Sequence, residues 1–458
     1  MELIQSFVDH AMKLDFPALP KSVVEKTKLF ILDSLGVALA GSRAPGVAPV
    51  AALMAEWAGK AESTVIYFGN KLSMLDAALV NSMMIHALDF DDVNENAVIH
   101  PSCVQVPVAF AVAEQNPDVR GRDLITAIAL GTDISCRLAL GLSSGSGFIR
   151  TSTCGIFGAV LNAAKLRRSS KDEMVHALGI AFSQTAGNMQ AVADGALVKR
   201  MQPGFMARDG ILSVFLAERG ITGPRNTMVG KYGFLELYRR GEVHREKITQ
   251  GLGEHYEVDN VSVKPYPCGR FTHGAVELAI RAAEEYDLQA NQIEEITIRV
   301  NRKSQEYVGR PYDPTRGNLQ VMAQFCAPYA VAAGIVNRDL FIGEFDERVI
   351  KDPTIVELAL KTKSVIDESG DLGSEAAVGL VIKTRDGRTL STKVLYPKGH
   401  PKNFFTQDEF IAKFRRCADS CSPRLKKENI ERVVELVGGL EEVVKVGEIP
   451  KLLMQEPS

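Results

Sequence analysis

The sequence predicts a mainly α protein, a large all-α helical domain with a smaller α+β domain inserted into it. Three observations lead to this prediction. From the N-terminus to about residue 256, apolar side chains recur mainly at spacings of three and four, the pattern of amphipathic helices. Residues 293–300 alternate between apolar and polar side chains, which is typical of a β-strand. After residue 400 the helical spacing returns, so the last segment is expected to pack back onto the first.

Five helices are expected in the first part, over residues 23–40, 106–115, 123–140, 156–168 and 211–219. Their apolar residues fall at positions that share one face of a helix. The third helix follows a Gly-Arg-Asp start signal, and Gly220, directly after the fifth, is a typical helix end. Together these segments predict a helical bundle over residues 1–260.

The inserted domain is expected over residues 261–398. Its clearest signal is Asp386-Gly387, a dipeptide that favours a tight hairpin turn, between strand patterns at 378–384 and 388–396. Helical stretches lie between this hairpin and the strand at 293–300, which gives the domain its α+β character. Amphipathic helices at 407–417 and 427–437 then belong to the returning segment, residues 399–458.

The composition excludes several classes of protein. A chain of 458 residues with 46% hydrophobic residues can bury a large core, so disorder does not describe it. The 53 Lys and Arg nearly balance 56 Asp and Glu, and no basic run stands out, so no nucleic acid partner is expected. The N-terminus is acidic and polar, unlike a secretory signal, and no apolar run approaches the roughly 18 residues of a membrane span. No membrane partner is therefore expected.

The cysteines indicate a reducing compartment. Seven of them, an odd number, are dispersed between Cys103 and Cys421, unlike the dense paired cysteines of small secreted domains. We expect free thiols and a cytoplasmic location. Cys417 and Cys421 lie four apart, but no second pair with metal-ligand spacing follows them, so we interpret them as partly buried thiols on a helix face.

Residues 86–100 hold the densest polar cluster of the N-terminal half, with four carboxylates and two imidazoles. Neighbouring acids and imidazoles shift one another's pKa values toward neutral pH, so the cluster could hold a proton-transfer site. Its carboxylates could also bind a hard divalent cation. A third interpretation is an aspartate-capped helix start followed by a solvated loop. The spacing alone does not choose between these interpretations.

An ordered series of short motifs resembles the MmgE/PrpD family. The first is Ala87-Leu-Asp-Phe-Asp-Asp92, which precedes His100-Pro101. The others follow in the family's order: Thr151-Ser-Thr-Cys-Gly155 with Phe157-Gly158, Ala193-Asp194-Gly195 through Lys199-Arg200 to Pro203-Gly204, Lys264-Pro-Tyr-Pro-Cys268, Phe271-Thr272-His273, the weaker Arg310-Pro311, and Gly399-His400-Pro401. The resemblance covers nearly the whole chain, and the set is far more specific than any one motif.

The resemblance implies a reaction class. The family includes 2-methylcitrate dehydratases, cis-aconitate decarboxylases and an iminodisuccinate epimerase, which share proton chemistry at a carbon bearing or adjoining carboxylates. It also implies a helical domain with a smaller α+β lid, an active site between them, a homodimer, and no cofactor or metal. We therefore expect a small polycarboxylate substrate and an activity that survives exhaustive chelation.

Catalytic residues can be carried over only by this resemblance. It matches the active-site aspartate to Asp89, the His-Pro histidine to His100, the two site lysines to Lys199 and Lys264, and a site tyrosine to Tyr329. An imidazole has a reference pKa of about 6.5, which suits proton exchange near neutral pH, and lysines favour a developing enolate. Taken singly, Lys199 could be half of a solvated basic pair with its neighbour, and Tyr329 could be a core residue.

The substrate-binding set is predicted to be Asp92, Arg270 and His273. The last two lie near Gly269, which stands where decarboxylase-type members of the family have a lid histidine. Other departures are Ile149 in place of a histidine, Gln202 where a histidine often occurs, and Val93 where threonine is common. These changes argue against the known decarboxylase activity.

Three functions remain open. The preferred one is a hydro-lyase that removes a proton alpha to a carboxylate and expels a beta-hydroxyl, with Tyr329 or His273 as the acid for the leaving group. The second is an epimerase of a small dicarboxylate, which needs no leaving-group acid and is less affected by the loss at Ile149. The third is an inactive homologue that only binds a ligand, which the retained catalytic set disfavours.

Overall fold

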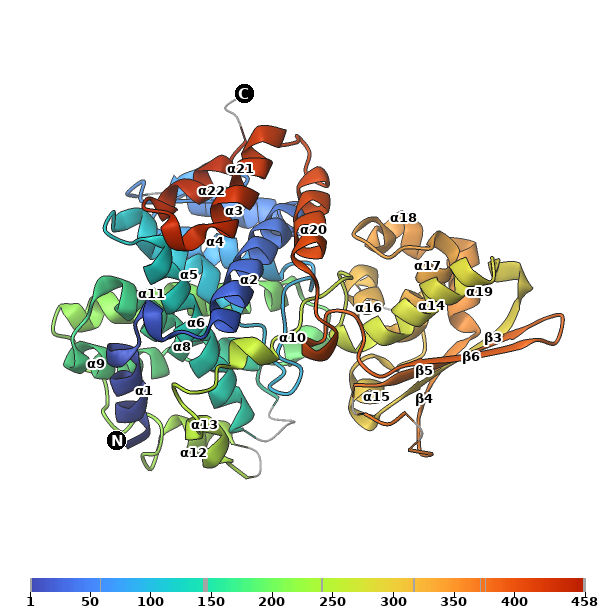
Figure 1. Cartoon of the computed structure of the whole chain (residues 1–458), viewed down its shortest axis with the longest axis horizontal. Coiled ribbons are helices and arrows are strands. Elements are labelled where there is room, and N and C mark those ends of the chain that lie inside the picture. Colours follow the sequence, from blue (N-terminus) through green and yellow to red (C-terminus); the bar gives the residue numbers. More distant parts are fainter. Residues whose placement is uncertain are drawn as a thin grey trace.

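The computed structural model describes residues 2–57, 59–142, 147–239, 242–315, 318–370, 372–374 and 376–455. It confirms a mainly α protein with a smaller α+β part. Figure 1 shows helices from both ends of the chain gathered in one large body, while the strands β3 to β6 lie at the opposite end of the molecule. Among the described residues, no helix combines the length and apolar character needed to cross a membrane.

The large body, called here the helical body, is the set of segments that build the first hydrophobic core, drawn from residues 3–263 and 410–453. Its main helices are α1 (Glu2–Lys13), α2 (Lys21–Gly41), α4 (Met74–His86), α5 (Ser102–Gln115), α6 (Gly121–Leu140), α8 (Gly155–Arg167), α9 (Lys171–Phe182) and α11 (Gln202–Glu218). The five expected helices are present as α2, α5, α6, α8 and α11. Most of their boundaries lie within a few residues of those expected.

Helix α11 differs most, because it begins at Gln202 rather than at residue 211. Two glycines interrupt its apolar pattern, yet they serve close helix packing. A Cβ at Gly204 would lie 2.6 Å from the carbonyl oxygen of Leu79 in α4, and one at Gly210 would lie 2.5 Å from the Cβ of Ala159 in α8. The missing side chains therefore let the helix axes approach, which the sequence pattern conceals.

The smaller part, called here the lid, is built on a second core drawn from residues 268–382. Its sheet has the order β4-β3-β5-β6, formed by β3 (Ile293–Val300), β4 (Thr362–Ile366), β5 (Val378–Thr384) and β6 (Thr389–Val394). The expected hairpin is present as β5 and β6, and the turn glycine Gly387 has a φ of 85°. The short edge strand β4, parallel to β3, was not expected. Helices α14 (His273–Glu285) and α17 (Ala327–Asn337) pack with this sheet.

The chain then returns to the helical body through α20 (Gln407–Asp419) and α21 (Lys427–Gly438), both of which contact α2. A buried ion pair holds α20 against α2, because Lys413 Nζ lies 2.6 Å from Asp33 Oδ1. All seven cysteines are free, as the sequence predicts, and all are buried. Cys417 lies in α20, whereas Cys421 follows the end of that helix. The lid is therefore inserted between two segments of one continuous helical core.

Candidate active site

The site is built on the loop that leaves α4 and enters α5. This loop carries Asp89, Asp91, Asp92, Glu95 and His100. Asp89 has a φ of 53°, in the left-handed region that a non-glycine residue rarely occupies, so the chain turns sharply at the carboxylate. Lys413 of α20 supports the turn, because its Nζ donates a hydrogen bond to the carbonyl of Phe90 over 3.0 Å.

Asp89 is held by two lysines. Lys199 Nζ lies 2.8 Å from Oδ1, and Lys264 Nζ lies 2.8 Å from Oδ2 and 2.7 Å from the Asp89 carbonyl oxygen. Burial raises the pKa of Asp89, but the Lys199 and Lys264 ammonium groups outweigh it and hold the pKa well below its usual value. Two cations thus surround one carboxylate, which leaves a local excess of positive charge. The structure brings these three predicted residues together.

His100 belongs to a second group centred on Asp91. Its Nδ1 lies 3.4 Å from Asp91 Oδ1, while His86 Nδ1 is hydrogen-bonded to Asp91 Oδ2 over 2.8 Å. Burial lowers the pKa of His86 to about 4, so this imidazole is neutral near pH 7 and donates its Nδ1 proton to Asp91. The His100 side chain keeps 16% of its surface exposed, whereas that of Asp91 has none. Of these residues, His100 is therefore the one whose side chain a ligand can reach.

Asp92 points to the start of α5. Its Oδ1 accepts from the backbone N–H of Ser102, the first residue of the helix, over 3.2 Å, and its Oδ2 accepts from the Ser102 hydroxyl over 2.6 Å. Burial raises the pKa of Asp92 to about 8. These contacts match the expected aspartate-capped helix start, but the expected solvated loop is wrong, because residues 89–94 are buried. The predicted role in substrate binding stays a prediction.

Arg270 joins the lid to the helical body. Its Nε donates to Glu95 Oε1 over 2.7 Å, and its Nη1 donates to the carbonyl of Lys398 over 2.8 Å. Burial raises the pKa of Glu95, but Arg270 and the Ser262 hydroxyl outweigh it, so the pKa is lowered. The carboxylate therefore stays ionised, and the predicted substrate contact Arg270 sits in a buried ion pair.

His273 and Tyr329 lie within the lid. The His273 imidazole is buried, with Nε2 3.2 Å from the Cys268 carbonyl oxygen, and burial lowers its pKa well below the usual value. Tyr329 lies on α17, where its ring packs against Tyr312 and its hydroxyl donates to the Glu344 carbonyl. Burial raises the pKa of Tyr329. Their predicted roles at the site stay predictions.

The sequence offered weaker signals for His86, Asp91 and Glu95. All three lie in the polar cluster, but spacing did not reveal that Asp91 would join two imidazoles. Lys413 gave no signal, since it lies 323 positions from the carbonyl that it binds. Such supports become visible only in the folded chain.

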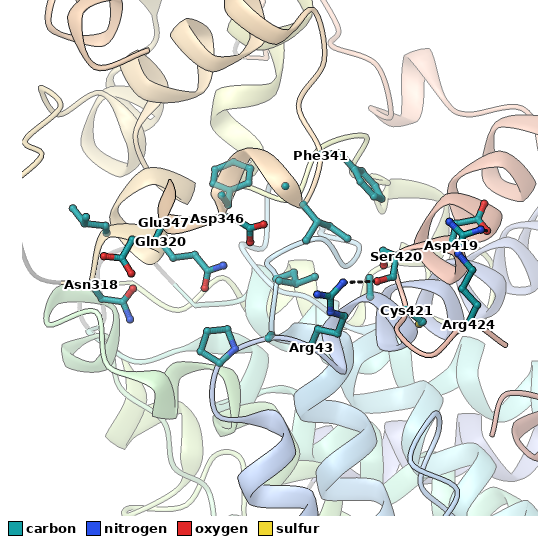
Figure 2. Close-up of a pocket in the computed structure, with 18 residues that line it drawn as sticks. Arg43, Asn318, Gln320, Phe341, Asp346, Glu347, Asp419, Ser420, Cys421 and Arg424 are labelled. Atoms are coloured by element: carbon teal, nitrogen blue, oxygen red, sulfur yellow. Dashed lines mark hydrogen bonds and ion pairs between the residues drawn. The ribbon is translucent and has the colours of Figure 1, made fainter. Parts of the chain in front are cut away.

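A cavity of about 750 Å³ lies at the junction of the lid and the helical body. Figure 2 shows side chains on both walls, with Arg43, Asp419, Ser420 and Arg424 from the helical body and Asn318, Gln320, Asp346 and Glu347 from the lid. Leu88, which directly precedes Asp89, also lines it. The Arg200 guanidinium binds the carbonyl of Pro45 and the side chain of Gln320, both over 2.9 Å. The cavity wall thus includes the residue that precedes Asp89 and two residues that bind the side chain of Arg200, which follows Lys199.

Comparison with known proteins decides the family. The sequence model of the MmgE/PrpD N-terminal domain matches residues 5–246, and that of the MmgE/PrpD C-terminal domain matches residues 266–437. The chain belongs to the MmgE/PrpD family. A cis-aconitate decarboxylase from Aspergillus terreus is 28% identical over 463 residues, which cover 95% of this chain and 92% of that protein. The cis-aconitate decarboxylase of Homo sapiens is 25% identical over 474 residues, which cover 98% and 94% of the two chains.

At the positions where this MmgE/PrpD chain was expected to differ from the family pattern, the residues are buried or bind the backbone. Ile149 is buried directly before the short helix α7 (Arg150–Thr153). The side chain of Gln202 accepts from the backbone N–H of Asn188 over 2.6 Å and donates to its carbonyl over 3.2 Å. Val93 forms an isolated bridge with Ser262.

Gly269 leaves room for an aromatic ring. A Cβ at this position would lie 3.1 Å from the ring of Phe325. Lys199 Nζ lies 5.5 Å from the centroid of the same ring. Phe325 therefore forms an apolar wall beside the lysine.

Proposed function

We propose that this protein is a lyase that acts on a small polycarboxylate and transfers a proton through His100 at a carbon adjoining a carboxylate. The observation that carries the proposal is that one loop holds both Asp89, which Lys199 and Lys264 bind, and the partly exposed His100, which contacts Asp91. The names of the relatives, which are cis-aconitate decarboxylases, support a lyase and a polycarboxylate substrate.

The proton step follows from the orientation of His100. Because its Nδ1 faces Asp91, its Nε2 is the atom that exchanges a proton with the substrate. When the imidazole takes up a proton, the Asp91 carboxylate stabilises the new positive charge. The buried His86 donates to the other oxygen of Asp91 and keeps that carboxylate in position.

The lysines supply the positive charge that the substrate requires. Removal of a proton alpha to a carboxylate places negative charge on the substrate, and prearranged cations lower the energy of that state. The Lys199 side chain is 13% exposed, so its ammonium can reach a substrate, whereas the fully enclosed Lys264 positions Asp89. Lys199 is therefore a catalytic residue in this proposal, and Lys264 is a positioning residue.

Dehydration is the first candidate for the net reaction. His100 removes the proton, and the Lys199 ammonium gives a proton to the departing hydroxyl. His273 suits this acid role less well, because its buried imidazole has a strongly lowered pKa and is neutral at working pH. Tyr329 suits it less well too, because its hydroxyl is already bonded within the lid.

Decarboxylation is the second candidate, favoured by the names of the relatives. Carbon dioxide leaves without needing a proton, so a single proton carrier that protonates carbon is enough. His100 could perform that step alone, although the replacement of two family histidines by Ile149 and Gly269 counts against this candidate.

Proton NMR in deuterium oxide tests the proposal and separates the candidates. The protein is incubated with hydroxy-tricarboxylates, hydroxy-dicarboxylates and cis-aconitate. New alkene signals from a hydroxy acid would establish dehydration, whereas a deuterated product with one carboxylate fewer would establish decarboxylation. Deuterium exchange with inversion and no new product would replace the lyase proposal with an epimerase. Absence of exchange on every compound would favour a ligand-binding homologue.

A further inference from the structure

Asp91 lies among side chains that are good ligands for a transition metal. A nitrogen of His86, a carboxylate oxygen of Asp91 and the Sγ of Cys103 all lie within 4.8 Å of one another, and all three residues are buried. His100 adds a fourth donor, with its Nδ1 3.4 Å from Asp91 Oδ1. The Asp92 and Glu95 carboxylates are engaged elsewhere, with Ser102 and Arg270. The group is thus one of mixed nitrogen, oxygen and sulfur ligands rather than an acidic cluster.

Two of these atoms are incompletely satisfied. Among the described residues, Asp91 Oδ1 and His100 Nδ1 are both buried without a hydrogen-bond partner of good geometry, although they face one another. Two ligands of a tetrahedral zinc ion, each at about 2.0–2.1 Å, are separated by roughly 3.3 Å. The observed 3.4 Å between the two atoms is close to that separation.

We propose that His86, Asp91, Cys103 and His100 form a binding site for Zn²⁺, and that zinc bound there inhibits the enzyme. The binding part stands on the mutual distances of His86, Asp91 and Cys103 and on the contact of His100 with Asp91. The inhibition part rests on the proposed function, in which His100 carries the proton.

The chemistry of the four ligands favours zinc over magnesium or calcium. Imidazole and thiolate are preferred by zinc, whereas the two harder ions prefer oxygen ligands. When the Zn–S bond forms, the Cys103 thiol releases its proton to solvent, and the ion takes the place of the proton between His86 and Asp91. The His86 ring then carries its proton on Nε2. One thiolate and one carboxylate neutralise the two charges of the ion, which makes its burial tolerable.

Bound zinc would remove two features that the proton step needs. The ion fixes the His100 ring through Nδ1, and it occupies the Asp91 carboxylate that would stabilise a protonated imidazole. Of the four proposed ligands, only His100 is partly exposed, with 16% of its side chain accessible to solvent. The ion therefore enters past the catalytic residue. Substrate and zinc therefore compete for access.

The test measures zinc binding directly. The full-length protein is freed of metal, dialysed against Zn²⁺ and analysed for bound zinc, and Co²⁺ is used as a spectroscopic probe. We expect one tightly bound zinc per chain and, with Co²⁺, a near-ultraviolet thiolate-to-cobalt band. Cys103→Ser should retain the hydrogen bond to the His100 carbonyl but weaken zinc binding by about a hundredfold and abolish the cobalt band.

Cys136→Ser is the matched control, because Cys136 is an equally buried thiol on a neighbouring helix. It should bind zinc as the parent does. If Cys103→Ser does not fold, as judged by circular dichroism, Cys103→Ala replaces it. Unchanged zinc affinity in the folded Cys103 variant, or a cobalt spectrum without a thiolate band, would overturn the site.

Activity measurements test the inhibition part separately. Zinc should abolish turnover of the parent in step with occupancy, and a chelator should restore it, whereas the Cys103 variant should keep its turnover at the same zinc concentration. Full turnover by the zinc-loaded parent would refute inhibition and leave the binding result intact. Zinc stoichiometry and cobalt spectra need no substrate, so they decide the metal site even if no lyase activity is found.

Discussion

The helical body and the lid both reach the candidate active site, but they supply side chains in different states. In the loop of the helical body, His100 keeps a partly exposed side chain, whereas Asp89 is buried between Lys199 and Lys264. The predicted residues of the lid are already engaged, Arg270 with Glu95 and Tyr329 with a backbone carbonyl. The comparison favours His100 of the helical body over the predicted lid residues as the carrier in the proposed proton step.

The largest effect is expected at Lys264, which lies in the segment between the two regions. Lys264→Met leaves the buried Asp89 carboxylate with one cation instead of two. Breaking a buried ion pair costs about 3–5 kcal/mol of unfolding free energy, and turnover should fall as well. Lys199→Met is the matched variant and should cost less stability, because water can reach the partly exposed position. Urea unfolding of both variants measures the difference, and equal losses would contradict the assignment of Lys264 as the positioning residue.

His100→Gln should lower turnover by about a hundredfold or more, the scale of general acid–base assistance, and hardly change the melting temperature. Glutamine keeps the polarity and approximate size of the side chain but cannot titrate. Turnover and thermal unfolding should be measured on one preparation. A folded variant with near-native turnover would move the proton chemistry away from the helical body.

Asp92 gives a pH-dependent prediction. Its pKa is about 8 in the folded protein and about 3.8 in the unfolded chain, so the folded state holds the extra proton between these values. The contribution of Asp92 to the free energy of unfolding is therefore greatest below about pH 4. It falls by about 1.4 kcal/mol per pH unit until the folded pKa is reached. Asp92→Asn removes this loss, so its stability advantage over the parent should grow between pH 5 and pH 7, as followed by urea unfolding. A flat difference for Asp92→Asn would rule out the raised pKa.

The smallest effect is expected inside the lid. Tyr329→Phe removes the hydrogen bond to Glu344 and should lower stability by about 1 kcal/mol with little change in turnover. Tyr312→Phe removes a comparable bond to the Ile350 carbonyl and is the control. If Tyr329→Phe slows turnover while Tyr312→Phe does not, the tyrosine predicted by family resemblance has a catalytic role and the lid supplies more than enclosure.

Local patterns predicted much of the fold. Asp386-Gly387 marked the hairpin because its turn requires a residue with positive φ, and the strand at β3 matched residues 293–300. The patterns missed β4, a short edge strand whose pairing depends on a distant partner. They also placed the start of α11 too late, because Gly204 and Gly210 look like interruptions until α4 and α8 are seen packing on them.

The site was predictable only in part. Family resemblance named Asp89, Lys199 and Lys264, which meet in space. Sequence spacing could not show that Asp92 turns toward Ser102, that Glu95 binds Arg270, or that Phe325 faces Lys199. Each of these contacts joins segments that only the folded chain brings together, so no local pattern encodes it.

The insertion of the lid also determines when the helical body can be completed during synthesis. Helix α2 is covered by Phe414 of α20, whose ring would lie 3.0 Å from a Cβ at Gly36. Ribosomes add roughly 5–20 residues per second, so tens of seconds separate the emergence of these two helices. During that interval the nascent chain exposes the apolar face of α2. We therefore expect the helical core to be completed only after α20 has emerged, and a chain ending before Gln407 to aggregate.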